Sequence, residues 1–122
     1  MSDTVDDSHQ PPAERVRDLG PLELRSARDG DVQTITLTGE LDLHSKVGVE
    51  QELRRVEDAD ATVIRLDLTN VTFIDSTGIG LLLGATSRSR EKGVRLELER
   101  PPDSVMRLLT VAGVIRLLPF VN

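Results

Sequence analysis

The sequence predicts an α/β domain: one mixed β-sheet of four to five strands packed against α-helices, in the order β-β-α-β-α-β-α-β. Segments of alternating polar and apolar residues take turns with segments of helical spacing, which favours crossover connections and a largely parallel sheet. A turn signal at Asp29-Gly30-Asp31 makes the first connection a hairpin, so the sheet is mixed. The 122 residues, 38% of them hydrophobic, suit a single domain with a core of Leu, Val and Ile.

The first half of the domain is expected to contain the hairpin and one helix. A short strand begins near Leu22, where leucines alternate with charged residues. The second strand covers residues 32–38, which are rich in β-branched side chains. A helix over residues 45–57 follows, with Ser45 as its expected N-cap and valines and leucines at helical spacing on its inner face.

The second half repeats the alternation of strand and helix. Strands are expected over residues 63–68 and 94–98, because apolar and charged residues alternate in both. A central helix over residues 76–92 separates them. A further helix over residues 103–112 precedes a short last strand within residues 114–120.

The first 20 residues differ in composition from the rest of the chain. They carry five acidic residues and two arginines, and the pairs Pro11-Pro12 and Gly20-Pro21 interrupt or end them. This composition predicts a disordered acidic N-terminal tail over residues 1–20 and a domain over residues 21–122.

Composition also narrows the class of function. The net charge of −6, the absence of Trp and Tyr and the two Phe argue against a partner such as nucleic acid or an anionic membrane. The absence of cysteine excludes disulfide scaffolds and thiol chemistry. The acidic start is unlike a signal peptide, and no apolar run approaches the roughly 18 residues of a membrane span. We therefore expect a cytoplasmic protein.

Residues 71–84 are the most informative stretch of the chain. An apolar, β-prone run ends at Asp75-Ser76-Thr77, and a helical pattern with three glycines follows. Asp and Ser before an apolar run are helix start signals, and a hydroxyl there lies at the positive end of the helix dipole. Gly80 and Gly84 are four residues apart, so we expect them to let the helix approach the sheet closely.

Ser76 has two interpretations, a structural N-cap and a functional hydroxyl, and spacing alone favours the first. A catalytic nucleophile is not expected, because a serine hydrolase needs a histidine base and a Gly-x-Ser-x-Gly turn. The histidines here are His9, in the tail, and His44, and the sequence around Ser76 lacks that turn. One histidine with scattered carboxylates does not predict a metal site. We therefore expect no enzyme activity.

Two segments carry a family resemblance. Residues 73–80, Phe-Ile-Asp-Ser-Thr-Gly-Ile-Gly, closely resemble the signature of STAS domains of the anti-sigma factor antagonist type. Gly39-Glu40-Leu41-Asp42 resembles that family's second conserved stretch, and the resemblance covers roughly residues 22–120.

The resemblance implies a partner-switching function. Members of this family bind an anti-sigma factor serine kinase when unphosphorylated, which frees the sigma factor. That kinase brings ATP and magnesium and phosphorylates the serine after the motif aspartate, here Ser76, and a serine phosphatase reverses the step. Asp42 matches the acidic residue near the switch, and Asp75, Thr77 and Gly78 adjoin it. No stably bound cofactor is implied.

Two departures from the family pattern affect the expectations. The segment before Leu22 is longer than in compact members, and the chain stops at Asn122 where many members continue into a final helix. An uncovered last strand would favour dimers, so we expect a monomer or a weak homodimer. The alternative function is a STAS module that only scaffolds an assembly or binds a ligand, but such a module needs no serine at position 76.

Overall fold

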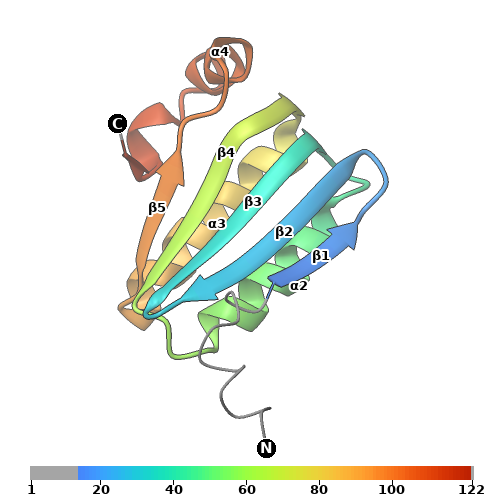
Figure 1. Cartoon of the computed structure of the whole chain (residues 1–122). Coiled ribbons are helices and arrows are strands. Elements are labelled where there is room, and N and C mark those ends of the chain that lie inside the picture. The colour runs from blue at the N-terminus through green and yellow to red at the C-terminus, as the bar shows by residue number, and fades with distance from the viewer. Residues whose placement is uncertain (1–13, 122) are drawn as a thin grey trace, which may run out of the picture.

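The computed structural model of the chain describes residues 14–121 and shows six strands in one sheet, whose spatial order follows their order in the sequence (Figure 1). The strands are β1 (Glu14–Asp18), β2 (Leu22–Asp29), β3 (Val32–Leu41), β4 (Val63–Ile74), β5 (Arg95–Glu99) and β6 (Phe120–Val121). The helices are α2 (Lys46–Glu57), α3 (Ser76–Lys92), α4 (Asp103–Ala112) and the single 3-10 turn η1 (Ile115–Leu117).

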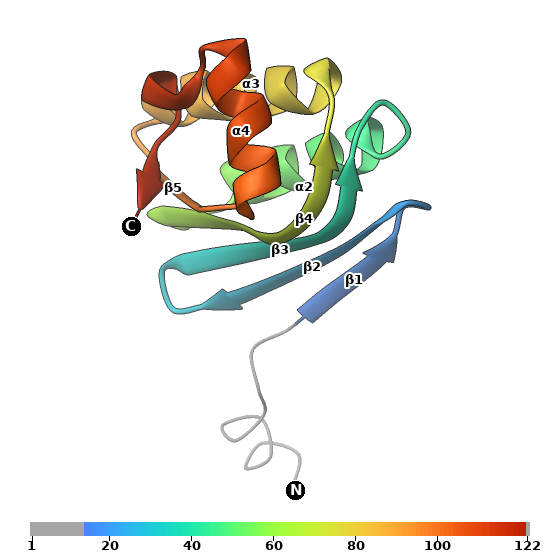
Figure 2. The same cartoon turned by 90° about the horizontal axis from the view of Figure 1, so that it is seen from above.

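The sheet is mixed, as the sequence predicts. Strands β1, β2 and β3 pair antiparallel, and β3, β4, β5 and β6 pair parallel. Helices α2 and α3 form the crossovers from β3 to β4 and from β4 to β5. They lie together on one face of the sheet (Figure 2), and α4 lies beyond the end of β5 (Figure 1).

The core lies between the sheet and the helices, because alternate strand residues point to the same face. The buried apolar side chains from β2 to β5 are Leu22, Leu24, Ile35, Leu37, Leu41, Ile64, Leu66, Leu68, Val71, Ile74, Leu96 and Leu98. Helices α2, α3 and α4 add Val49, Leu53, Val56, Leu81, Leu82, Ala85, Val105 and Leu109. The alternation of apolar and charged residues along the strands therefore predicted this arrangement correctly.

The predicted boundary of the disordered tail is wrong for residues 14–20, while residues 1–13 lie outside the described residues. Residues 14–18 form strand β1, which pairs with β2 from Glu14 opposite Ala27 to Asp18 opposite Glu23. Within residues 14–121 the sheet thus has six strands rather than four or five. Composition misled the prediction because the charged residues of β1 find partners on the domain itself.

Those partners lie on α2. The Arg15 guanidinium donates to Glu52 Oε1 at 3.3 Å, and Arg17 donates to the Gly48 carbonyl at 3.3 Å. Glu52 is almost fully buried. Burial raises the pKa of Glu52, but hydrogen bonds from Arg55 and Ser26 and the charges of Arg55 and Arg15 outweigh it, so the pKa lies below its ordinary value.

Most helix bounds agree with the sequence prediction. Helices α3 and α4 have the predicted bounds, and α2 begins one residue after Ser45. The Ser45 hydroxyl donates to the Glu40 carbonyl at 3.0 Å and makes no capping bond. The strand expected within 114–120 is mostly the turn η1, followed by the two residues of β6.

Candidate functional site

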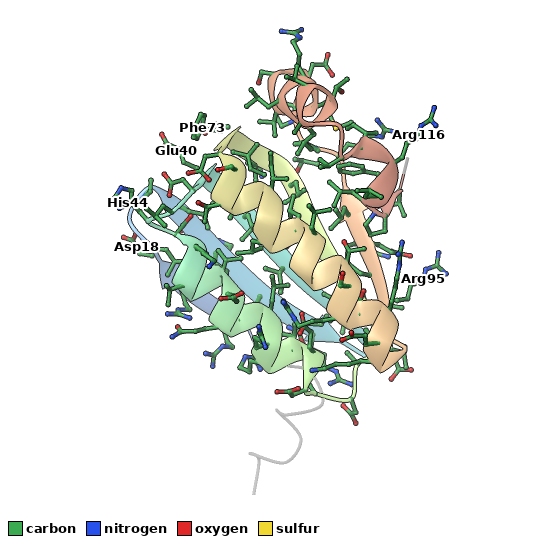
Figure 3. All side chains as sticks on the ribbon, turned by 180° about the vertical axis from the view of Figure 1, so that it is seen from behind. Asp18, Glu40, His44, Phe73, Arg95 and Arg116 are labelled. Atoms are coloured by element: carbon green, nitrogen blue, oxygen red, sulfur yellow. The ribbon has the colours of Figure 1, made fainter. Side chains whose placement is uncertain are left out.

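The candidate site lies where β3 and β4 end. The parallel register pairs Glu40 with Phe73 and Leu41 with Ile74, so the segments that follow these two strands lie side by side. Figure 3 shows the side chains of Glu40, His44 and Phe73 at the end of the molecule where α3 begins. In open α/β sheets, ligands bind outside the carboxyl ends of the parallel strands.

Asp75 joins the two segments and caps α3. Its Oδ1 accepts from the Gly78 N–H at 2.9 Å, and its Oδ2 accepts from the Leu43 N–H at 3.3 Å. Asp75 is therefore the N-cap, and the structural interpretation of Ser76 as the cap is wrong. Ser76 is the first helical residue and is exposed.

Asp42 shapes the turn before α2. Its Oδ1 accepts from the His44 N–H at 2.9 Å and from the Ser45 N–H at 3.2 Å. The Leu43 N–H, next along the chain, points to Asp75 instead. The structure thus places Asp42 in the loop that is hydrogen-bonded to Asp75, the residue before Ser76.

Gly78 is the glycine that lets α3 approach the sheet. A Cβ atom at this position would overlap the Leu41 carbonyl oxygen and lie 2.7 Å from Ile74 Cγ1. The expectation for Gly80 and Gly84 is wrong. A Cβ at Gly80 meets open space, and one at Gly84 meets only the flexible Arg88 side chain at 3.2 Å.

A hollow of about 430 Å³ lies between the first turns of α2 and α3. It is lined by Lys46, Glu50, Ser76, Thr77, Gly80, Leu81 and Gly84. Gly80 and Gly84 leave room for this hollow on the surface of α3, because neither carries a side chain. Lys46 and Glu50 are not predicted as site residues from the sequence, although their spacing of four residues places both on one face of α2.

Apolar side chains are exposed around this site. Leu43 is 66% exposed, Val47 is 62% exposed and Phe73 is 44% exposed. Leu43 and Val47 belong to the loop before α2 and to its first turn, and Phe73 lies near the end of β4. Clustered exposed apolar side chains next to polar groups are typical of a protein-binding surface.

The chemistry available at the site follows from these contacts. The carboxylates of Asp42 and Asp75 accept from backbone N–H groups, and the Ser76 hydroxyl lies at the positive end of α3. Within residues 14–121, no three His, Asp or Glu side chains gather as metal ligands do. None of the helices described is long and apolar enough to cross a membrane.

The chain is thus a small mixed-sheet domain that exposes a serine at the start of a crossover helix. The STAS domain family model matches residues 24–122. The anti-sigma-B factor antagonist of Listeria monocytogenes is 32% identical over 95 residues, which are 78% of this chain and 83% of the relative. The chain therefore belongs to the STAS domain family, among the anti-sigma factor antagonists.

Two solved structures share the fold. The anti-sigma factor antagonist SpoIIAA in its unphosphorylated form superposes with a TM-score of 0.64 at 21% identity, covering 90% of this chain and 89% of that one. The Bacillus cell fate determinant SpoIIAA in the phosphorylated form gives a TM-score of 0.58 at 20% identity, covering 90% and 92%. These relatives are named as regulators rather than as enzymes.

Proposed function

We propose that this chain binds an anti-sigma factor serine kinase in its unphosphorylated form and so releases a sigma factor. The same kinase, which brings ATP and magnesium, switches the chain off by phosphorylating Ser76, and a serine phosphatase restores it. The chain acts in the cytoplasm and holds no cofactor of its own. The observation that carries the proposal is that Ser76 is exposed at the start of α3 while Asp75 does the capping.

Asp75 caps α3, and Ser76 follows it without a capping role. A reversible switch requires that the modified residue is not needed to hold the fold. Because Asp75 holds the helix start, Ser76 is free to accept a phosphate without loss of a capping bond. The positive end of the α3 dipole tolerates the added negative charge. Modification therefore leaves the fold intact and changes only the surface.

The surface around Ser76 suits a partner that must be rejected after phosphorylation. Exposed Leu43, Val47 and Phe73 offer apolar contacts, and the low hollow over Gly80 and Gly84 admits a protruding element of the partner. A phosphate carries about −1.5 to −2 charges at pH 7. Placed in such an interface, it would be desolvated on binding and so weaken the complex.

Likeness to the relatives adds support for a phosphorylated state. One superposed structure is described as a phosphorylated form of SpoIIAA and another as its unphosphorylated form. The two share the fold of this chain, which agrees with a switch that works without refolding.

The proposal is tested by the affinity of purified variants for the anti-sigma factor kinases of the source organism, measured by titration calorimetry. Ser76→Ala should bind as tightly as the unmodified chain, since it only removes an exposed hydroxyl. Ser76→Glu should bind at least tenfold more weakly. Ser87→Glu is the matched control, because Ser87 is also exposed on α3 but lies three turns away.

Two results would contradict the proposal. Unweakened binding of Ser76→Glu would mean that charge at this position does not reject the partner. Failure of every such kinase to bind the unphosphorylated chain would favour the alternative, a STAS scaffold or ligand-binding module.

A further inference from the structure

Lys46 occupies a position that helix energetics disfavour. It is the first residue of α2, where the helix dipole is positive, and the first turn of α2 contains no acidic residue. The side chain is half-buried. Within residues 14–121 it has no salt-bridge partner, although Glu50 lies one turn further along α2 and pairs with Arg54. Lys46 is therefore a half-buried cation without a counter-ion at the unfavourable end of a helix. An anion that is present in only one state of the protein would stabilise it.

Lys46 and Ser76 line the same hollow. The hydrogen bond from the Leu43 N–H to Asp75 joins the loop before α2 to the start of α3. This bond helps to keep Lys46 and Ser76 at a constant distance from each other. Among the residues that line the hollow, Lys46 is the one that carries a positive charge. Lys46 is therefore the cation that a phosphate on Ser76 would meet in this hollow.

We infer that Lys46 binds the phosphate of phosphorylated Ser76 and so holds it in the hollow between α2 and α3. This inference rests on the proposed modification of Ser76. The phosphate otherwise faces negative groups, because Glu50 lines the hollow and Asp75 precedes the modified residue. A charge-assisted hydrogen bond from the ammonium group offsets that repulsion. Lys46 is thus a positioning residue for the phosphorylated state.

The consequence is a phosphorylated form that is stable on its own. Without Lys46, the phosphate would be repelled by Glu50 and Asp75 and would point to solvent. With Lys46, it is held at the centre of the surface that the partner must cover. The switched-off state then depends on an internal charge pair as well as on repulsion of the partner.

The test uses the full chain with phosphoserine incorporated at position 76 during translation, so no kinase is required. The pKa of the phosphate is measured by ³¹P NMR titration in the unmutated chain and in Lys46→Gln. It should be higher in Lys46→Gln by about half a unit, because an opposite charge favours the dianion. Glu50 and Asp75 raise it alike in both proteins. Lys46→Arg should restore the lower value, and Lys92→Gln, which removes a cation near the far end of α3, should leave it unchanged.

Thermal unfolding supplies a second readout. The change in melting temperature caused by phosphoserine should be less favourable by about 2–4 °C in Lys46→Gln than in the unmutated chain. Equal titration curves and equal temperature shifts in the two proteins would overturn the inference. A kinase that fails to modify Ser76 would instead sink the proposed switch and leave this result unaffected, so the two failures are distinguishable.

Discussion

Two glycines of α3 should respond in opposite ways to the same substitution. In Gly78→Ala the new methyl group overlaps the Leu41 carbonyl oxygen and crowds Ile74, so the helix must move away from β3. Overpacking against backbone costs up to about 3 kcal/mol. Alanine recovers about 1 kcal/mol of helix propensity, which leaves a net loss of about 2 kcal/mol. In Gly80→Ala the methyl group meets open space, so only the gain of about 1 kcal/mol remains.

Thermal and urea unfolding at pH 7 measure both effects. For a domain of this size, about 1 kcal/mol shifts the melting temperature by about 4 °C. Gly78→Ala should therefore melt about 8 °C lower and Gly80→Ala about 4 °C higher than the unmutated chain. Equal destabilisation of both variants would refute the orientation of α3 described above. A neutral Gly78→Ala would show that β3 and α3 are not in close contact.

Three further predictions test the architecture. Asp75→Ala should lower the free energy of unfolding by about 1 kcal/mol, because it removes the N-cap. Ser76→Ala should change it by less than about 0.5 kcal/mol. If urea unfolding showed the larger loss for Ser76→Ala, Ser76 would be the cap. The pKa of Glu52 is lowered in the folded state, so its carboxylate stabilises the fold above the ordinary value of 4.5 and this stabilisation is lost as the pH falls through the folded-state pKa. Glu52→Gln should thus lower the free energy of unfolding at pH 7 and make it fall less steeply as the pH is lowered. An unchanged dependence of this free energy on pH in acid would contradict the ion-pair network. Deleting residues 1–13 should leave the melting temperature within about 2 °C of that of the full chain. Deleting residues 1–18 removes β1 and should lower the melting temperature by more than about 5 °C. Equal melting temperatures for the two deletions would show that β1 does not stabilise the domain.

The sequence predicted those parts of the fold that have a strong internal period. The β-branched residues of β3, the alternation in β4 and β5 and the spacing in α4 each identify an element from local residues alone. Strand β1 has no such signal. Its residues are mostly charged, and it exists because Arg15 and Arg17 reach groups on α2 that are more than 30 residues away. Composition cannot reveal contacts at that separation.

The same limit applies at the site. The sequence correctly placed a helix start at Asp75-Ser76, but not which of the two side chains turns toward the Gly78 N–H. It identified three glycines, but the rotation of α3 about its axis decides which one meets the sheet. Lys46 could not be predicted as a site residue from the sequence. It lines the same hollow as Ser76, and the two residues come together only when β3 and β4 pair.

The most direct test of the central claim is to incubate the chain with a co-occurring anti-sigma factor kinase, ATP and magnesium, and to locate the phosphate by mass spectrometry. The proposed function predicts one phosphate on Ser76, none on Thr77, and no modification of the Ser76→Ala variant. Phosphate on Thr77 in that variant, with loss of kinase binding, would move the switch by one residue. An unmodified chain, with the kinase active on a known substrate, would contradict the switch itself.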